Sequence, residues 1–76
     1  MKCLIIKNGK GYYSLNGTDE IPLDNLSKED LLKILNLIVT GMATMDEYDE
    51  TAVLHTAHKI IYKNLYEKFK ELEINK

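Results

Sequence analysis

Arginine is absent from this chain of 76 residues, and all ten of its basic residues are lysines. Arginine makes the bidentate contacts to phosphate and guanine on which much specific nucleic-acid recognition depends. The lysines are not gathered into a basic block, and the formal net charge is −2. The sequence therefore predicts that nucleic acid is not a partner of this protein.

Cysteine occurs once, at Cys3, which excludes a disulfide within the chain. No set of cysteines and histidines has the spacing of a zinc site, so neither a metal nor another cofactor is expected. The chain lacks the run of roughly 18–20 apolar residues that spans a membrane, and the apolar run 3–6 is too short for a signal peptide. We therefore expect a cytoplasmic protein that does not bind a membrane.

The small size of the chain limits how stable a single core can be. We expect residues 1–76 to form one small domain. Domains below about 70–80 residues rarely gain more than roughly 3–5 kcal/mol from one core, and they usually add disulfides, a metal or a partner. Since the first two are not expected here, association with a partner is the remaining source of stability.

The N-terminal part of the chain has the pattern of a β-hairpin. Residues 2–7 alternate as a strand does, and Asn8-Gly9 is the strongest short signal for a hairpin turn. A two-residue turn pairs Leu4 with Tyr13, whereas a four-residue loop pairs Leu4 with Leu15. Both registers place the same side chains on the core face, namely Leu4, Ile6, Tyr13 and Leu15.

The segment that follows the hairpin has two interpretations. A second Asn-Gly pair at residues 16–17 is a turn signal, and residues 20–23 would then form a third strand of a meander. Pro22 lacks a backbone donor, so such a strand must lie at the edge of the sheet. An extended loop over the same residues fits the sequence equally well.

A short apolar helix is predicted over residues 28–40. Ser27 is a natural N-cap, and Gly41 is a natural left-handed stop after the last turn. Apolar side chains of Leu31–Val39 cover well over half of the helix circumference, which is wider than one core face requires. Either a partner covers the excess, or the hairpin and a second helix cover it from two sides.

A longer helix is predicted over residues 46–72, because this segment contains neither proline nor glycine. Acidic residues crowd its first turn, where the helix dipole favours them. One apolar stripe along it is expected to face the core: Leu54, Ala57, Ile61, Leu65 and Leu72, flanked by Val53 and Ile60. The predicted fold is α+β, with an N-terminal antiparallel β-hairpin or three-stranded meander followed by a short and a long helix packed as a helical hairpin.

A row at intervals of seven residues accompanies that stripe and consists of Tyr48, His55, Tyr62 and Phe69, with Tyr66 one turn from Tyr62. Steps of seven drift by only about 20° on a straight helix, so these side chains are expected to lie in line. Tyrosine, phenylalanine and histidine combine apolar area with polar tips, as interface residues do. The alternative is that the hairpin covers them. The candidate interface residues are Tyr48, His55, Tyr62, Tyr66 and Phe69.

His55 and His58 lie three residues apart on the predicted long helix. This spacing could supply two metal ligands, but a third ligand is not evident and the His-Glu-x-x-His motif is absent. His58 borders the apolar stripe, so a partly buried histidine with hydrogen-bond partners is the simpler interpretation. No catalytic, cofactor-binding or metal-binding residue is assigned.

Three functions remain after these exclusions. The preferred one is a small, non-enzymatic, cytosolic protein–protein interaction or regulatory module whose partner is a second copy of itself. The first alternative is a phage- or plasmid-type inhibitor that binds a nucleic-acid enzyme through the acidic surface of residues 46–50. The second alternative is a very small oligomeric enzyme that uses His55 and His58.

Overall fold

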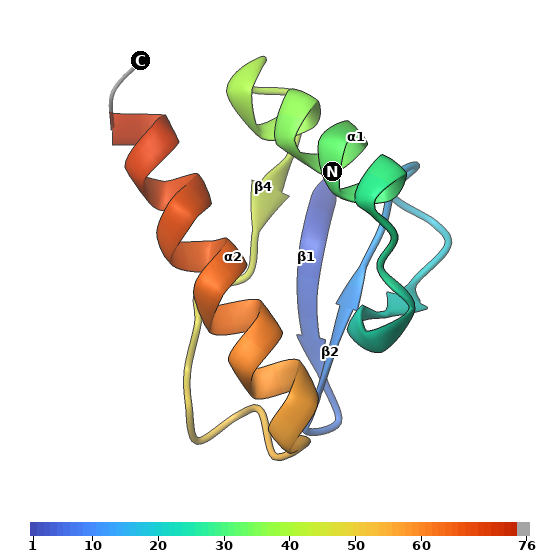
Figure 1. Cartoon of the computed structure of the whole chain (residues 1–76), viewed down its shortest axis with the longest axis vertical. Helices are drawn as coiled ribbons and strands as arrows, with labels where there is room; N and C mark the ends of the chain where they lie inside the picture. The colour runs from blue at the N-terminus through green and yellow to red at the C-terminus, as the bar shows by residue number, and fades with distance from the viewer. Residues whose placement is uncertain (75–76) are drawn as a thin grey trace.

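The computed structural model of the chain describes residues 1–74, and it shows an α+β fold with a four-stranded mixed sheet and two helices (Figure 1). Residues 1–74 also include a 3₁₀ turn, η1. In chain order the elements are β1 (Lys2–Lys7), β2 (Lys10–Tyr13), β3 (Ile21–Pro22), η1 (Leu23–Asn25), α1 (Lys28–Val39), β4 (Thr44–Met45) and α2 (Thr56–Ile74).

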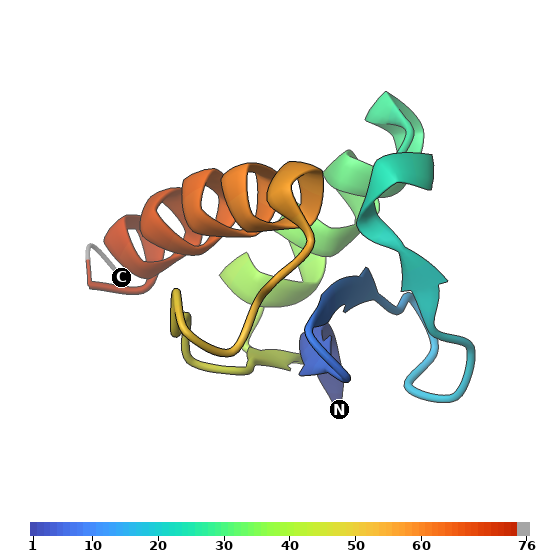
Figure 2. The ribbon, with the colours of Figure 1, turned by 90° about the horizontal axis from the view of Figure 1, so that it is seen from below.

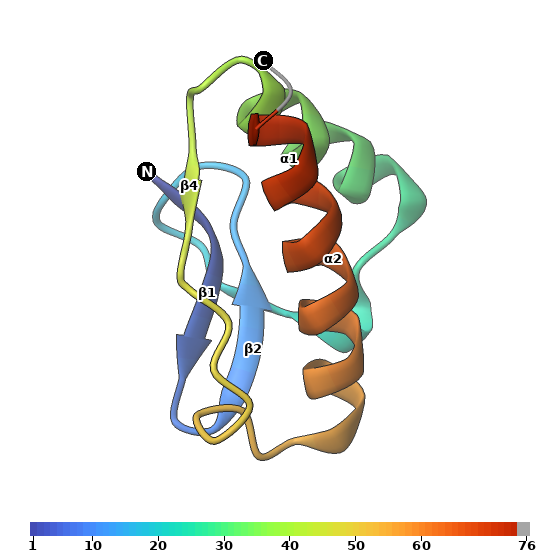
Figure 3. The ribbon, with the colours of Figure 1, turned by 90° about the vertical axis from the view of Figure 1, so that its left-hand side faces the viewer.

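The strands lie in the order β3-β2-β1-β4, with β4 parallel to β1 and the other neighbours antiparallel. Both helices lie on one face of this sheet, as the view in Figure 2 shows. Figure 3 shows β4 beside β1 at one edge of the sheet, with α2 running along the length of the molecule on the helical side. Two of the four strands are only two residues long, so the central hairpin carries most of the sheet.

The central hairpin has the two-residue turn that Asn8-Gly9 predicts. Both residues have positive φ angles, 53° and 77°, as a type I′ turn requires. The register pairs Leu4 with Tyr13, which is the first of the two predicted registers. Leu4 and Tyr13 are fully buried, while Ile6 and Leu15, the other two predicted core residues, are half-buried.

Helix α1 begins and ends within one residue of the predicted range 28–40. The Ser27 hydroxyl accepts a hydrogen bond from the Asp30 amide, which is the expected N-cap contact. At the other end Gly41 has φ 75°, and the amides of Gly41 and Met42 donate to the carbonyls of Ile38 and Leu37. These two bonds form a Schellman motif, which satisfies carbonyl groups at the end of the helix.

Tyr13 connects the hairpin to the first turn of α1. Its hydroxyl donates to Oδ2 of Asp30 over 2.7 Å and lies 3.4 Å from the carbonyl oxygen of Asn25. Burial, together with the nearby Asp30 carboxylate, raises the pKa of Tyr13 to about 12. The side chain therefore stays uncharged at any pH at which the fold is expected to operate.

Helix α2 begins at Thr56, which corrects the predicted start at residue 46. Side chains in the acidic segment bind the backbone locally or reach the sheet, and such bonds compete with helix formation. Asp49 accepts from the amide and the hydroxyl of Thr51, and the amides of Leu54 and His55 both donate to the carbonyl of Gly9. The chain is therefore held against the hairpin turn until residue 55, and the helix cannot start earlier.

The connection between the helices also differs from the predicted helical hairpin. The sequence predicts a short link over residues 42–45, whereas β4 and the irregular segment 46–55 separate α1 from α2 along the chain. The residues 44–45 pair with β1 because the chain leaves α1 at Gly41 in the direction of the sheet edge (Figure 3).

The predicted core stripe of α2 is correct in part. Ile61 and Leu65 are half-buried against the core, but the fully buried side chains of the helix are His58, Tyr62 and Phe69, and Ile60 is 59% exposed. Val53 is buried and Leu54 is 78% exposed, and both precede the helix.

The sheet below the helix leaves space for this packing at Gly11. A Cβ atom added there would stand 2.7 Å from Cδ1 of Leu23 and 3.3 Å from Cδ2 of Tyr62, so the absent side chain makes room for both residues.

Two side chains complete the central hairpin where the short edge strands end. Beyond β4, the amide of Ile6 donates to Oδ2 of Asp46 over 3.1 Å. Beyond β3, the amide of Gly11 donates to Nδ1 of His58 over 3.1 Å. Backbone donors in such positions must find a partner, since an unpaired buried amide destabilises the fold. Asp46 and His58 therefore act as substitutes for missing strand residues.

The Asp46 carboxylate makes two contacts, a hydrogen bond from the Ile6 amide and an ion pair with Lys2 at 2.8 Å. Comparing variants of Asp46 with a variant of Lys2 separates the contributions of these two contacts to stability. We expect Asp46→Ala to lower the free energy of unfolding by about 1–2 kcal/mol, because the Ile6 amide loses its acceptor. Asp46→Asn keeps an acceptor oxygen and should lose less. Urea unfolding of these variants beside Lys2→Ala, which removes only the exposed ion pair, is the measurement; equal losses for Asp46→Ala and Lys2→Ala would contradict the assignment.

Candidate functional site

The predicted aromatic row does not form a continuous surface. Tyr62 and Phe69 are buried in the core, and Tyr66 is half-buried beside Tyr62. Tyr48 lies in the irregular segment before α2 and stacks on Tyr62 with ring centroids 6.1 Å apart. His55 is exposed at the start of α2. Of the five predicted interface residues, Tyr62 and Phe69 are therefore unavailable at the surface of the chain.

Tyr62 has a structural role in this core. Its hydroxyl donates to the carbonyl of Asp46, which connects α2 to the segment that follows β4. Burial is the main reason why the pKa of Tyr62 is raised well above its usual value, and the nearby Asp46 carboxylate adds to this effect. The ring thus fills the space above Gly11, while its polar end holds the far edge of the sheet.

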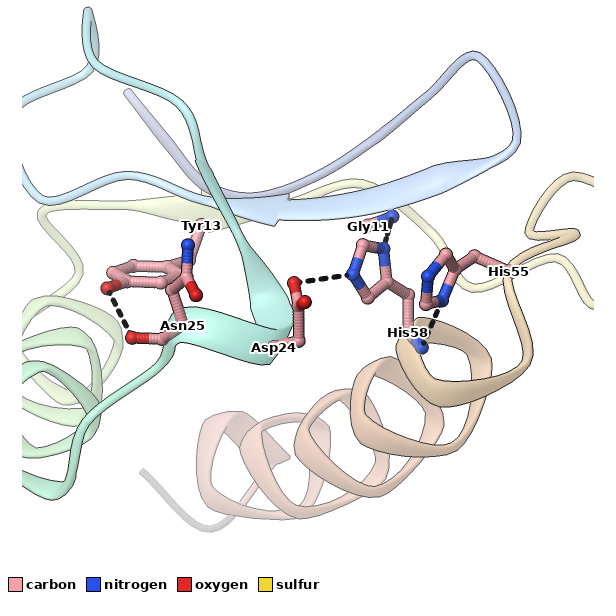
Figure 4. A network of polar contacts seen from close by, with 6 residues as sticks. All are labelled: Gly11, Tyr13, Asp24, Asn25, His55 and His58. Carbon is pink, nitrogen blue, oxygen red and sulfur yellow. Dashed lines mark hydrogen bonds and ion pairs between the residues drawn. The ribbon is translucent and has the colours of Figure 1, made fainter.

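His58 is the centre of a polar contact between three elements, shown in Figure 4. Its Nε2 lies 2.9 Å from Oδ1 of Asp24 in η1, and its Nδ1 lies 3.1 Å from the amide nitrogen of Gly11 in β2. A backbone amide is always the donor, so Nδ1 is the acceptor and the ring proton is on Nε2, which donates to Asp24. The side chain is 2% exposed, and both of its nitrogens are engaged.

His55 is the N-cap of α2, a position that asparagine, aspartate and serine usually occupy. Its Nδ1 accepts from the amide of His58 over 3.3 Å, the bond that a capping side chain makes three residues into a helix. The two imidazole rings are stacked with centroids 3.8 Å apart and an interplanar angle of 21°. Both Nδ1 atoms therefore accept from backbone amides, and only Nε2 of His55 faces away from these contacts.

A small pocket of about 210 Å³ lies beside the two histidines. It is smaller than the roughly 300–1,000 Å³ of ordinary ligand pockets. Its walls contain charges of both signs, so it does not select an ion of one sign. The lining residues are Lys10, Tyr12, Pro22, Asp24, Asn25, His55 and His58.

The Asp24–His58 pair resembles a catalytic dyad but is arranged to hold the fold together. In a dyad the imidazole keeps one nitrogen for the reacting group, whereas here that nitrogen accepts from Gly11. Hydrogen bonding from His58 is the main reason why the pKa of the Asp24 carboxyl is lowered. In the part of the chain that the structure describes, no three His, Cys, Asp or Glu residues are grouped as a metal site requires.

The acidic segment does not form one uniform charged face. Asp46 binds the Ile6 amide and Lys2, and Asp49 caps the turn at Thr51. Hydrogen bonds from Thr51 keep the pKa of the Asp49 carboxyl low. Residues 47–50 border an open hollow of about 540 Å³, which is lined by Glu47, Tyr48, Asp49 and Glu50.

The clearest apolar surface lies between the two helices. A groove of about 250 Å³ separates α1 from α2, and its polar contribution comes from a single lysine. Leu32 is 56% exposed on one side of the groove and Leu72 is 41% exposed on the other. We call this surface the α1–α2 groove, and its residues are Leu31, Leu32, Leu35, Leu65, Lys68, Phe69 and Leu72.

The groove explains part of the wide apolar surface of residues 31–39, because Leu31, Leu32 and Leu35 form one of its walls. Ile34 and Ile38 are buried against the rest of the chain, so the hairpin and α2 cover one side of α1. Leu32 and Val39 lie seven residues apart on another side, and both remain exposed. The hairpin and the second helix therefore cover the apolar surface of α1 only in part.

Comparison of the chain with protein-family models, with curated proteins and with solved structures finds no match. None of the helices in residues 1–74 is long and apolar enough to cross a membrane. The function must therefore be argued from the surfaces described above.

Sequence reasoning identified both histidines but missed their partners. Asp24 is 34 residues from His58 and Gly11 is 47 residues from it, so no local spacing signals these contacts. In the sequence, Gly11 follows the predicted hairpin turn, and nothing there indicates that its amide lacks a strand partner and binds a side chain instead. The groove was signalled by the excess of apolar residues in 31–39, although its second wall on α2 was not predicted.

The Asp24–His58 bond predicts how stability changes in acid. The pKa of Asp24 is lower in the folded chain than its ordinary 3.8, so its ionised form stabilises the fold above pH 3.8. This contribution should be lost as the pH falls from 3.8 through the lower folded value.

Asp24→Asn keeps an acceptor but cannot ionise, so it should lack this part of the pH dependence. Unfolding free energies of both proteins, measured from neutral pH into strong acid, test the prediction. The two curves should converge as the pH falls below 3.8. A constant difference over the whole range would mean that the carboxylate charge is irrelevant to the contact.

Proposed function

We propose that this chain is a small, non-enzymatic protein–protein interaction module of the cytoplasm that binds a second copy of itself through the α1–α2 groove. The observation that carries the proposal is the exposure of leucines on both walls of one apolar groove. A groove with these walls offers a site for the apolar side chains of another helix.

The apolar area in the groove favours association with another apolar surface. Burial of apolar area contributes roughly 25 cal/mol per Å², and a leucine that becomes fully buried contributes about 1.5–3 kcal/mol. Leu32 and Leu72 are both large and substantially exposed, and Leu31, Leu35 and Leu65 are only partly covered. A chain of this size depends on such gains, because its own core is small.

A second copy is the occupant that the charges beside this groove favour. On α1, Glu29 and Lys33 pair with each other at 3.7 Å, and on α2 Lys68 stands three residues before Glu71. Two identical copies therefore meet without an excess of one charge.

The chemistry of the histidine cluster supports a non-enzymatic function. Both nitrogens of His58 are engaged inside the protein, and Nδ1 of His55 caps α2. The enzyme alternative uses both histidines, whereas Nε2 of His55 is the one imidazole nitrogen of the pair that these contacts leave for a substrate. The inhibitor alternative would need a uniform acidic face, whereas Asp46 and Asp49 use their carboxylates within the chain.

The mass in solution tests the proposed dimer. We expect twice the chain mass of 8.8 kDa, measured by light scattering after gel filtration over a series of concentrations. Leu32→Glu should raise the dissociation constant of the dimer by about tenfold or more, because a charge would enter the apolar contact, and each tenfold corresponds to about 1.4 kcal/mol.

Leu54→Glu is the matched control, since Leu54 is an exposed leucine beside the hairpin turn and outside the groove. It should leave the dissociation constant unchanged. A monomer that persists at about 1 mM protein, where even an association of about 4 kcal/mol is half formed, would contradict the proposal. Equal effects of the two glutamate substitutions would also contradict it.

A further inference from the structure

We infer that the contact between the hairpin and the start of α2 is an acid-sensitive joint, in which protonation of the stacked pair His55 and His58 releases the first turn of α2 from β2. The inference is independent of the proposed dimer. It rests on which atoms accept hydrogen bonds in this pair.

Each ring of the pair accepts a backbone hydrogen bond at Nδ1. His58 accepts from Gly11, which fixes α2 to β2, and His55 accepts from His58, which caps the helix. A histidine that gains a proton has donors at both nitrogens and no acceptor left. Protonation of either ring therefore opposes an N–H donor with another N–H, and one bond that holds the joint is lost.

The surroundings add an electrostatic cost to protonation of the pair. Two imidazolium rings would face each other with centroids 3.8 Å apart, and both would lie at the N-terminus of α2, where the helix dipole disfavours positive charge. Lys10 of β2 borders the same pocket, and Lys59 follows His58 on α2. Tyr12 of β2 also lines the pocket.

Asp24 of η1 is the group in this pocket that favours a positive charge on His58. Its carboxylate lies 2.9 Å from Nε2, so it attracts an imidazolium, and this attraction opposes the electrostatic costs described above. The bond from Nε2 to Asp24 also persists after protonation, because Nε2 already carries a proton. Acid therefore removes the Gly11 contact and leaves the Asp24 contact in place.

The release is expected to be local. Tyr62 and Phe69 keep the middle and the end of α2 in the core, and the Tyr62 hydroxyl still holds the carbonyl of Asp46. The segment that opens consists of the first turn of α2 and the hairpin turn, where the amides of Leu54 and His55 bind Gly9. The joint is expected to open when acid adds a proton to either ring, and histidine is the side chain whose ordinary charge change lies closest to neutral pH.

Amide hydrogen exchange measured by NMR on the full chain tests this inference. We expect protection factors of the Gly11 and His58 amides to fall about tenfold or more between about pH 7.5 and about pH 5, the range in which histidine gains its charge. The Thr40 amide, which binds the carbonyl of Asn36 at the end of α1, is the internal control and should keep its protection factor.

Asparagine offers a matched substitution at both positions, because its side-chain oxygen accepts a hydrogen bond at any pH. Asparagine is among the best N-caps, so His55→Asn should preserve the start of α2 and remove the pH dependence of the His58 amide. His58→Asn should likewise keep an acceptor for Gly11. Because His55 is exposed, the His55→Asn variant is expected to fold even where His58→Asn does not.

Two results would overturn the inference. The first is unchanged protection of the Gly11 and His58 amides in the wild-type chain across this pH range. The second is the same acid-induced loss at the Gly11 amide in a folded His58→Asn variant as in the wild type, which would assign the opening to other groups.

Discussion

The fold depends on the backbone donors of one hairpin that extends beyond its neighbouring strands. β3 and β4 are two residues long, so the amides of Gly11 and Ile6 have no strand partner. His58 and Asp46 supply the acceptors, and both come from segments more than 39 residues away in the chain. Satisfying these donors determines where α2 starts, which face it buries and how the chain returns from β4.

Local signals in the sequence were enough to predict the elements with clear ends. Asn8-Gly9 predicted the turn but left two registers open, of which the structure has the one that pairs Leu4 with Tyr13. Ser27 and Gly41 predicted the ends of α1. The start of α2 was not predictable from such signals, because residues 46–55 contain no helix breaker. Long-range bonds to the Gly9 carbonyl and from the Ile6 amide compete with helical bonds there. The local bonds from Thr51 to the side chain of Asp49 compete as well.

For the candidate surfaces too, the local composition was visible in the sequence, but the long-range packing was not. The excess of apolar residues in α1 was visible in the sequence, and it corresponds to an exposed wall of the α1–α2 groove. The aromatic residues of α2 were visible too, but whether they face the core or solvent depends on the rotation of the helix. Gly11 leaves space that Leu23 and Tyr62 share, and a lone glycine in a strand gives no sign of which side chains will occupy that space.

The central claim is that His58 replaces a strand partner for Gly11, with Nδ1 as the acceptor. NMR of the uniformly ¹⁵N-labelled chain at neutral pH tests it most directly, through the scalar coupling that passes across an N–H···N hydrogen bond. The account predicts a coupling between the Gly11 amide nitrogen and Nδ1 of His58, with the ring proton on Nε2. A ring proton on Nδ1, or the absence of this coupling in a folded chain, would contradict it.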